Sequence, residues 1–411
     1  MTRRVVITGL GALSPVGNNP EETWANLLAG KSGISEISLF DASDYAVKIA
    51  GEVKGFTPDE WIDPKEARHM DRSVQFAVVA AGQAVKDAQL DMANEDPDRV
   101  GIVFGSAAGG VGTLVTQQAT LMERGPRRVS PHFLPNFLAD SSSGQVAISL
   151  GAKGPNMAVV SACATGAHAV GEAMETIKRG DADVMLAGGT DAVIVPVIVA
   201  GFINMRALGD DVTPQKASKP FDARRNGFIL SEGAAVLVLE EYERALSRGA
   251  RIYAEVVGYG STNDAFHMAA QLENGDGAAR TMQRALNKAG ITAGMIDYIN
   301  AHGTSTPIND RVETAAIKRV FGDAAYKVAI SSTKSTTGHM MGASGALEAI
   351  VCALAIRDSR IPPTINYEVP DPDCDLDYTP NKARDLQVNY ALSNSIGLGG
   401  HNASVILKKV G

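Results

Sequence analysis

The sequence predicts an α/β protein whose core sheet is largely parallel and whose architecture is duplicated. Short apolar runs of strand length alternate along the chain with longer segments of helical periodicity. That alternation is typical of a parallel sheet covered by helices. A faint repeat supports the duplication, because Ala164-Thr165-Gly166-Ala167 and Ala343-Ser344-Gly345-Ala346 each open a helix rich in small residues.

The first half of the chain contains strands and helices in alternation. Its predicted strands are the apolar runs at residues 5–8, 99–104, 157–161, 183–187 and 235–239. Its predicted helices are 71–88 and 165–178. A helix and a new strand meet near Ser247-Arg248-Gly249-Ala250, so we divide the chain there into residues 1–250 and 251–411.

The second half repeats the pattern. Strands are predicted at residues 254–257, 298–301, 328–332, 388–393 and 403–407. Helices are predicted at 277–289, 311–321 and 344–357.

Composition and charge exclude several classes of function. Of the 411 residues, 45% are hydrophobic and 20% charged, as in ordinary globular proteins. The net charge of −8 gives no basic field for nucleic acid. No segment approaches the ~18 apolar residues of a membrane span, and the N-terminal apolar run is too short for a signal peptide. We therefore expect a cytoplasmic protein without a membrane segment.

Two motifs of cofactor or metal binding are incomplete. The three cysteines are far apart and show no CxxC spacing, which predicts reduced thiols rather than a disulfide framework or a zinc site. Gly9-Leu10-Gly11-Ala12-Leu13-Ser14 follows a strand but lacks the third glycine of a dinucleotide fingerprint. We expect no nucleotide cofactor.

Cys163 is the first candidate for a catalytic residue. It ends the run Val159-Val160-Ser161-Ala162-Cys163 and stands where the next helix is predicted to begin. Unpaired N–H groups and the helix dipole at such a place lower the pKa of a thiol and can bind an oxyanion. A buried structural cysteine is the alternative interpretation.

Two histidines follow predicted strand ends in the second half. His302 lies in the run Asn300-Ala301-His302-Gly303-Thr304, and His339 comes five residues after Lys334, which Glu348 on the next helix could pair with. Functional side chains of α/β folds gather at such strand ends. Each signal alone is weak. Together with Cys163 they fit thioester exchange, and two neutral imidazoles could stabilise an enolate formed when carbon dioxide leaves.

Four motifs in this order strongly resemble the β-ketoacyl-acyl-carrier-protein synthases. They occupy residues 160–166, 300–307, 334–339 and the Gly-rich run 393–402, and the resemblance extends from Arg4 to the last strand. Ala-Cys-Ala-Thr-Gly at 162–166 favours the synthase II subgroup. The resemblance implies a thiolase-like fold, with two βαβαβαββ halves in a five-layered αβαβα core, and a homodimer.

The resemblance also implies a role for each motif. Cys163 would be the acylated nucleophile, while His302 and His339 would bind the malonyl thioester and promote decarboxylation. Lys334 would support them electrostatically, paired with Glu348. The backbone N–H groups of Cys163 and Leu398 would form the oxyanion hole. No cofactor is expected, since the phosphopantetheine arrives on the carrier protein.

The resemblance also implies which residues contact the substrate. Contacts to the acyl chain or the pantetheine arm are implied for Thr304, Thr306, Ala108, Phe133, Ile396 and Leu398. The family has two phenylalanines where this chain has Ile396 and Leu398, which puts aromatic gating of the acyl pocket in doubt. Ala108 stands where the subgroup often has a bulkier aliphatic residue. A deeper channel would follow, so we expect medium-to-long acyl primers.

The partner implied by the resemblance is an acyl carrier protein. Carriers are acidic and this chain is net acidic, so docking needs a local basic patch. The candidates are Lys65, Arg68, Arg72, Arg127, Arg128 and Arg206, and scattered solvated charges are the alternative interpretation. Some relatives bind a monovalent cation at positions that match Asn300, Glu348, Ser393 and Asn394.

Rival functions remain at this point. A thiolase would need a second catalytic cysteine, but Cys352 lies in a predicted helix and Cys374 in an acidic loop. A polyketide-type condensing enzyme would share every motif. A non-catalytic subunit that only shapes chain length typically lacks the nucleophile, and a purely structural protein would not need Cys163, His302 and His339 together.

Overall fold

The computed structural model describes residues 3–411. Its core is a ten-stranded sheet in the order β10-β9-β13-β14-β8-β1-β7-β6-β4-β5. Two sets of strands meet in it between β1 (Val5–Leu13) and β8 (Ala254–Asn263), which pair through Val6 with Glu255 and Ile7 with Ala254.

The two sets have the same topology. The first consists of β1, β4 (Val100–Gly105), β5 (Asn156–Met157), β6 (Val184–Asp191) and β7 (Gly233–Glu241), and the second of β8, β9 (Tyr298–Asn300), β10 (Ala329–Ser331), β13 (Tyr390–Gly397) and β14 (His401–Lys408). Numbered along the chain within each set, both have the order 3-2-4-5-1. Strands 2, 3 and 4 of each set are parallel, and strand 5 is antiparallel to both of its neighbours. The architecture is therefore duplicated; the domain division at residue 250 falls between β7 and β8 and stays a prediction.

Helices α7 (Thr165–Arg179) and α13 (Ser344–Asp358) form the middle layer. Every residue of α13 from Ser344 to Ile356 is buried. Glycine lets the two helices approach closely, because a Cβ on Gly166 would lie 2.6 Å from the backbone N of Ala346, and one on Gly345 would lie 2.6 Å from that of Ala167. The two small-residue segments of the sequence repeat thus pack against each other.

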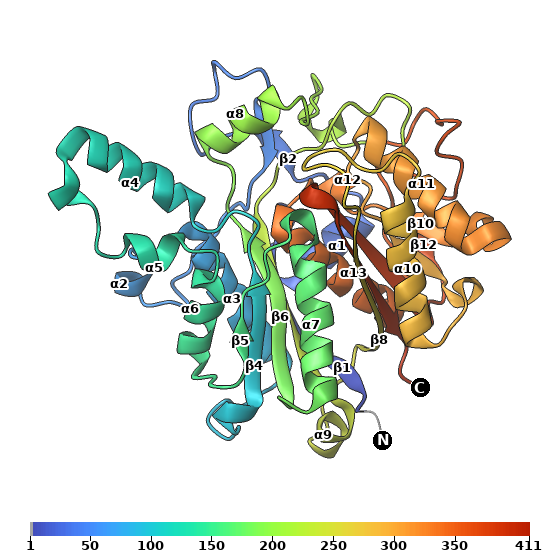
Figure 1. Cartoon of the computed structure of the whole chain (residues 1–411), viewed down its shortest axis with the longest axis horizontal. Helices are drawn as coiled ribbons and strands as arrows, with labels where there is room; N and C mark the ends of the chain where they lie inside the picture. The colour runs from blue at the N-terminus through green and yellow to red at the C-terminus, as the bar shows by residue number, and fades with distance from the viewer. Residues whose placement is uncertain (1–2) are drawn as a thin grey trace.

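Outer helices cover the remaining faces. α3 (Arg72–Asp87) packs on β1 and β7, and α6 (Ser141–Leu150) packs on α3. On the other side, α10 (Asp276–Ala289) packs on β8 and β14, with α11 (Pro307–Phe321) beside it. In Figure 1, α3 and α6 lie at the left of the strands and α10 and α11 at the right. The layers are therefore α3 and α6, the first set of strands, α7 and α13, the second set of strands, and α10 and α11.

Shorter elements surround this core. α4 (Val111–Arg124) and α5 (Phe133–Phe137) stand away from the sheet, as Figure 1 shows, and Val111 is the single buried residue of α4. The others are α1 (Pro20–Leu28), β2 (Ile34–Glu36), β3 (Ile49–Gly51), α2 (Pro64–Ala67), α8 (Pro196–Asn204), α9 (Tyr242–Ser247), α12 (Lys334–Thr337), β11 (Arg360–Ile361) and β12 (Arg384–Asp385). No helix within residues 3–411 is long and apolar enough to cross a membrane.

The strand predicted at 157–161 is wrong in most of its length. β5 ends at Met157. The N–H of Ser161 binds the hydroxyl of Thr165 at 2.9 Å instead of a neighbouring strand. The chain is thereby turned toward α7, which places the residues after Ser161 at the start of that helix.

Candidate active site

Cys163 lies in a turn between β5 and α7. A 3₁₀ turn, Ala162–Ala164, runs directly into α7, and Ala162 has a φ of 50°. The thiol is buried, with 6% of the residue exposed. The Gly-rich turn after β13 packs against it, since a Cβ on Gly397 would lie 3.2 Å from the backbone N of Cys163. The nucleophile candidate is therefore held by both halves of the chain.

Both histidines reach the same place from the second half. His302 follows β9, and its backbone N–H donates to Oε1 of Glu313 at 2.8 Å. His339 follows α12, and its Nδ1 is 3.0 Å from the hydroxyl of Ser344. The sulfur of Cys163 and one ring nitrogen each of His302 and His339 lie within 4.8 Å of one another. The structure thus brings the three predicted side chains together.

The two imidazoles are neutral. Burial lowers the pKa of His302 and of His339 well below 6.5, and the Lys334 ammonium lowers both further. Nε2 of His339 is buried and has no hydrogen-bond partner among residues 3–411. If the hydroxyl of Ser344 donates to Nδ1, the imidazole proton sits on Nε2. His339 can then donate a hydrogen bond to a substrate.

The pKa of the thiol is raised, not lowered as the sequence led us to expect. Burial raises the pKa of Cys163 to about 11 and outweighs the N–H of Leu398 and the charge of Lys334, which both lower it. The start of α7 cannot offset the loss of water around the sulfur. Cys163 is accordingly a thiol, not a thiolate, in the free protein.

Lys334 and Glu348 form the expected ion pair. The ammonium donates to Oε1 of Glu348, and both side chains are 2% exposed. Burial raises the pKa of Glu348 to about 7, although Lys334 opposes this. The pair places a positive charge near both imidazoles without leaving a net charge in the core.

A cavity of about 420 Å³ opens onto the three side chains. It is lined by Cys163, His302 and His339 and, among the residues expected to contact substrate, by Thr304, Thr306, Ile396 and Leu398. Arg206 lines it as well and is exposed. The cavity has room for part of a thioester substrate, with Arg206 available for a negative group.

Two expected substrate contacts lie elsewhere. Ala108 packs in the apolar cluster that contains Cys163 but does not line the cavity. Phe133 opens α5, where it stacks on Phe137 and borders a different hollow beside Arg68 and His132. Because α4 and α5 stand away from the sheet, Phe133 does not reach the cavity at Cys163 of the same chain.

The predicted docking cations are also separated. Lys65 on α2, Arg68 just after it, and Arg127 and Arg128 after α4 are exposed but do not line the cavity beside Arg206. The guanidinium of Arg72 is 2.7 Å from the buried carboxylate of Glu232, so it is already paired within the chain, and docking by any of these cations stays a prediction.

Sequence reasoning missed three residues of the site. Glu313 accepts the backbone N–H groups of His302 and Gly303 and holds that turn. Ser344 contacts the imidazole of His339. Asp191 accepts hydrogen bonds from two turns near Cys163. The available signal was an acidic residue at the end of a strand for Asp191 and within a helix for Glu313. Many such residues are only solvated, and Ser344 carried no signal of this kind.

The residues expected around a monovalent cation include atoms without partners. Both amide atoms of Asn300, Oε2 of Glu348 and the hydroxyl of Ser393 are buried and lack a hydrogen bond within the described chain. Oxygen atoms of this kind fit a small cation. The side chain of Asn394 is different, because it bonds Glu313 and Ser404.

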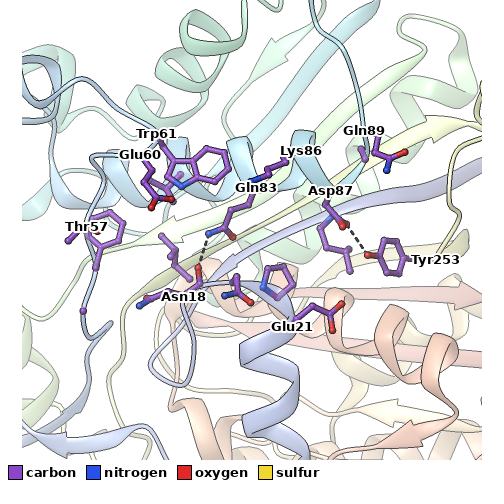
Figure 2. Close-up of a pocket in the computed structure, with 18 of the residues that line it drawn as sticks. Asn18, Glu21, Thr57, Glu60, Trp61, Gln83, Lys86, Asp87, Gln89 and Tyr253 are labelled. Carbon is purple, nitrogen blue, oxygen red and sulfur yellow. Dashed lines mark hydrogen bonds between the residues drawn. The ribbon is translucent and has the colours of Figure 1, made fainter.

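A larger cavity of about 700 Å³ lies outside this site, between α3, the start of α1 and residues 55–61. Figure 2 shows that groups on its wall bind one another, with Gln83 donating to the carbonyl of Asn18 and Tyr253 to Asp87. No cysteine or histidine is among its lining residues. It is not a candidate for the thioester chemistry.

Two family models match the chain. The model described as beta-ketoacyl synthase, N-terminal domain, matches residues 2–245, and that described as beta-ketoacyl synthase, C-terminal domain, matches residues 253–368. A 3-oxoacyl-(acyl-carrier-protein) synthase 2 of Staphylococcus aureus (strain N315) is 52% identical over 407 residues, covering 99% of this chain and 98% of the relative. The enzyme of the same name from Synechocystis sp. is 49% identical over 410 residues, with 99% and 98% covered.

Solved structures are similar over the full length. The ishigamide ketosynthase/chain length factor is 40% identical, with a TM-score of 0.94 and 100% of both chains covered. A type II polyketide ketosynthase, in complex with its acyl-carrier protein and bound to the hexaketide, is 35% identical, with a TM-score of 0.92 and the same coverage. Together with the duplicated sheet, these likenesses confirm the predicted thiolase-like fold.

Proposed function

The chain belongs to the β-ketoacyl synthase family, and from that premise we propose how its residues carry out the reaction. The enzyme is a condensing acyltransferase of fatty-acid synthesis. It joins an acyl group to malonyl-acyl-carrier protein and gives carbon dioxide and a β-ketoacyl-carrier two carbons longer. One observation carries the proposal: a thiol and two neutral imidazoles, from opposite halves of the chain, lie within 4.8 Å of one another.

In the first step, Cys163 takes the acyl group from a carrier thioester. The sulfur of Cys163 gives up its proton and attacks the carbonyl, the new C–S bond replaces the old one, and the departing pantetheine sulfur takes up a proton. The oxygen that becomes negative would be bound by the N–H groups of Cys163 and Leu398. Leu398 supports this role, because its N–H already lowers the pKa of the Cys163 sulfur.

In the second step, malonyl-carrier enters the cavity and loses carbon dioxide. His302 and His339 donate hydrogen bonds to the thioester oxygen, on which the electron pair of the broken C–C bond collects. The resulting enolate attacks the acyl thioester on Cys163 and releases the sulfur, which takes up a proton. Neutral imidazoles suit this role, and burial keeps both in that form.

This scheme needs no bound cofactor, since the phosphopantetheine comes on the carrier. A monovalent cation would be held by the unpartnered oxygen atoms of Asn300, Glu348 and Ser393, and a contribution from Asn394, whose side-chain atoms are already bonded, stays a prediction. Bound there, it would neutralise buried carboxylate charge behind the imidazoles.

An acyl carrier protein is the proposed partner, and the exposed Arg206 at the cavity supports this. We propose a homodimer as well, because β5 ends the sheet with Asn156 and Met157 exposed, next to exposed Val160. A second copy would cover this edge. Sedimentation equilibrium at the mass of a monomer would contradict it. Three free thiols support a reducing compartment, the cytoplasm.

Cys163→Gln tests the function. The variant should lose elongation of acyl-carrier yet still release carbon dioxide from malonyl-carrier, because both histidines remain. Cys352→Ala is the control, since it removes another buried thiol, which does not line the cavity. Normal elongation by the Gln variant, measured by mass spectrometry of the carrier, would refute the assignment.

A further inference from the structure

A buried aspartate at the end of β6 joins two turns from different halves of the chain. The Asp191 side chain accepts the hydroxyl of Ser106 at 2.7 Å, the N–H groups of Ala107 and Ala108 at 3.1 Å each, and the N–H of Gly342 at 2.7 Å. It is fully buried, with 0% exposed. Three of the donors belong to the turn after β4, and the fourth belongs to the turn that starts α13. The carboxylate therefore ties the first half to the second.

Both turns pack around the nucleophile, but of their residues only Met341 lines the cavity. Ala108 and Met341 pack in the same apolar cluster as Cys163, and Met341 also lines the cavity. Met341 has a φ of 48°, a left-handed conformation that a methionine keeps only where its surroundings hold it. A Cβ on the next residue, Gly342, would lie 2.8 Å from Oδ2 of Asp191. The strained turn is thus pressed directly onto the carboxylate.

The carboxylate also acts on the thiol through its charge. Burial is the main reason why the pKa of Cys163 is raised, and the negative charge of Asp191 raises it further. Burial raises the pKa of Asp191 itself to about 6, against hydrogen bonds that lower it. At neutral pH the side chain is mostly ionised, so it keeps its hydrogen bonds and disfavours the thiolate.

We propose that Asp191 is a positioning residue of the condensation: it ties the Ala107–Ala108 turn, which packs in the cluster around Cys163, to the turn in which Met341 lines the cavity, and so sets the wall that an acyl chain on Cys163 meets. The inference rests on the proposed function, since the wall matters only if Cys163 is acylated. Asp191 does not touch the reacting atoms. Its effect should therefore depend on the length of the acyl chain, because a longer chain contacts more of the wall.

Asp191→Asn tests the proposal. The amide keeps the shape but turns an NH₂ group toward N–H donors, so hydrogen bonds to at least one turn are lost. The kcat/KM for acylation of Cys163 should fall about 10- to 100-fold with a long acyl-carrier and much less with acetyl-carrier. The rate of iodoacetamide alkylation should reach its midpoint at lower pH than in the unaltered enzyme, because a negative charge near the thiol is gone.

Ser106→Ala is the matched variant. It removes one of the four hydrogen bonds to Asp191, together with those that the Ser106 hydroxyl accepts from the N–H groups of Ala108 and Gly109, and it keeps the charge. It should show a loss with the same dependence on chain length and an unchanged alkylation midpoint. It also keeps the proposal testable if the Asn variant unfolds. An equal loss at every chain length in both variants, or none, overturns the proposal. Failure of the unaltered enzyme to be acylated would instead overturn the proposed function.

Discussion

The buried ion pair of Lys334 and Glu348 gives a sharp test of the electrostatics. Both side chains are 2% exposed, so Lys334→Met would leave the carboxyl of Glu348 in the core without its ammonium. Oε2 of Glu348 already lacks a partner in the described part of the chain. Removing one member of a buried pair typically costs about 3–5 kcal/mol. We expect the free energy of unfolding to fall by an amount of this order at alkaline pH.

The cost should depend on pH in a definite direction. Burial raises the pKa of Glu348 to about 7 even with Lys334 present, and the variant loses a charge that lowers this pKa. A carboxyl whose folded pKa lies above its unfolded pKa destabilises the fold as pH rises through the folded value, because it must ionise in the core. The cost of Lys334→Met should be small near about pH 5 and largest near about pH 9.

Urea unfolding at both pH values, followed by circular dichroism, measures the effect. The double variant Lys334→Met/Glu348→Gln removes the carboxyl charge as well, so it should recover most of the lost stability at the higher pH. A cost that is the same at both pH values, or no recovery in the double variant, would refute the reasoning.

Two further predictions concern single contacts. Ser344→Ala removes the partner of His339 Nδ1, and the loss of a fixed proton on Nε2 should slow malonyl decarboxylation about tenfold without changing alkylation of Cys163; an unchanged decarboxylation rate would show that another group orients the ring. Hydrogen bonds from Arg99 lower the pKa of Asp183 to about 2 despite partial burial. This pair therefore stabilises the fold above the unfolded pKa, and the benefit is lost as pH falls toward about 2. Asp183→Asn should cost ~1 kcal/mol at neutral pH and flatten acid unfolding in that window, and an unchanged acid transition would contradict this.

The sequence predicted those elements that bury a full apolar face. Residues 165–178 and 344–357 were expected as helices, and α7 and α13 match them within one residue at each end. α4 was not among the expected helices, and Val111 is the only one of its residues that is buried. Of residues 158–161, which were wrongly predicted as strand, the first three are apolar, but the bond between the Ser161 N–H and the Thr165 hydroxyl turns the chain there, and the apolar pattern does not show that bond.

The site residues could be predicted from the sequence where a single short motif identifies the functional side chain. Cys163, His302 and His339 all stand beside turns at strand ends or helix starts, which the sequence shows directly. The role of Asp191 could not be seen in this way, because its donors are 85 and 151 residues away. The pKa of the Cys163 thiol could not be predicted for the same reason, because it depends on how far residues distant in the sequence exclude water from the sulfur.

Burial favours the uncharged form of the Cys163 thiol and of both imidazoles. In many cysteine enzymes a thiolate is paired with an imidazolium. Here burial raises the pKa of Cys163 to about 11 and lowers that of His339 well below 6.5, so transfer of the proton from sulfur to imidazole is unfavourable. Malonyl-carrier, which brings its own carboxylate, then meets an uncharged acylated sulfur and two neutral donors. The proton that Cys163 gives up on attack is balanced by the one that the departing pantetheine sulfur takes up.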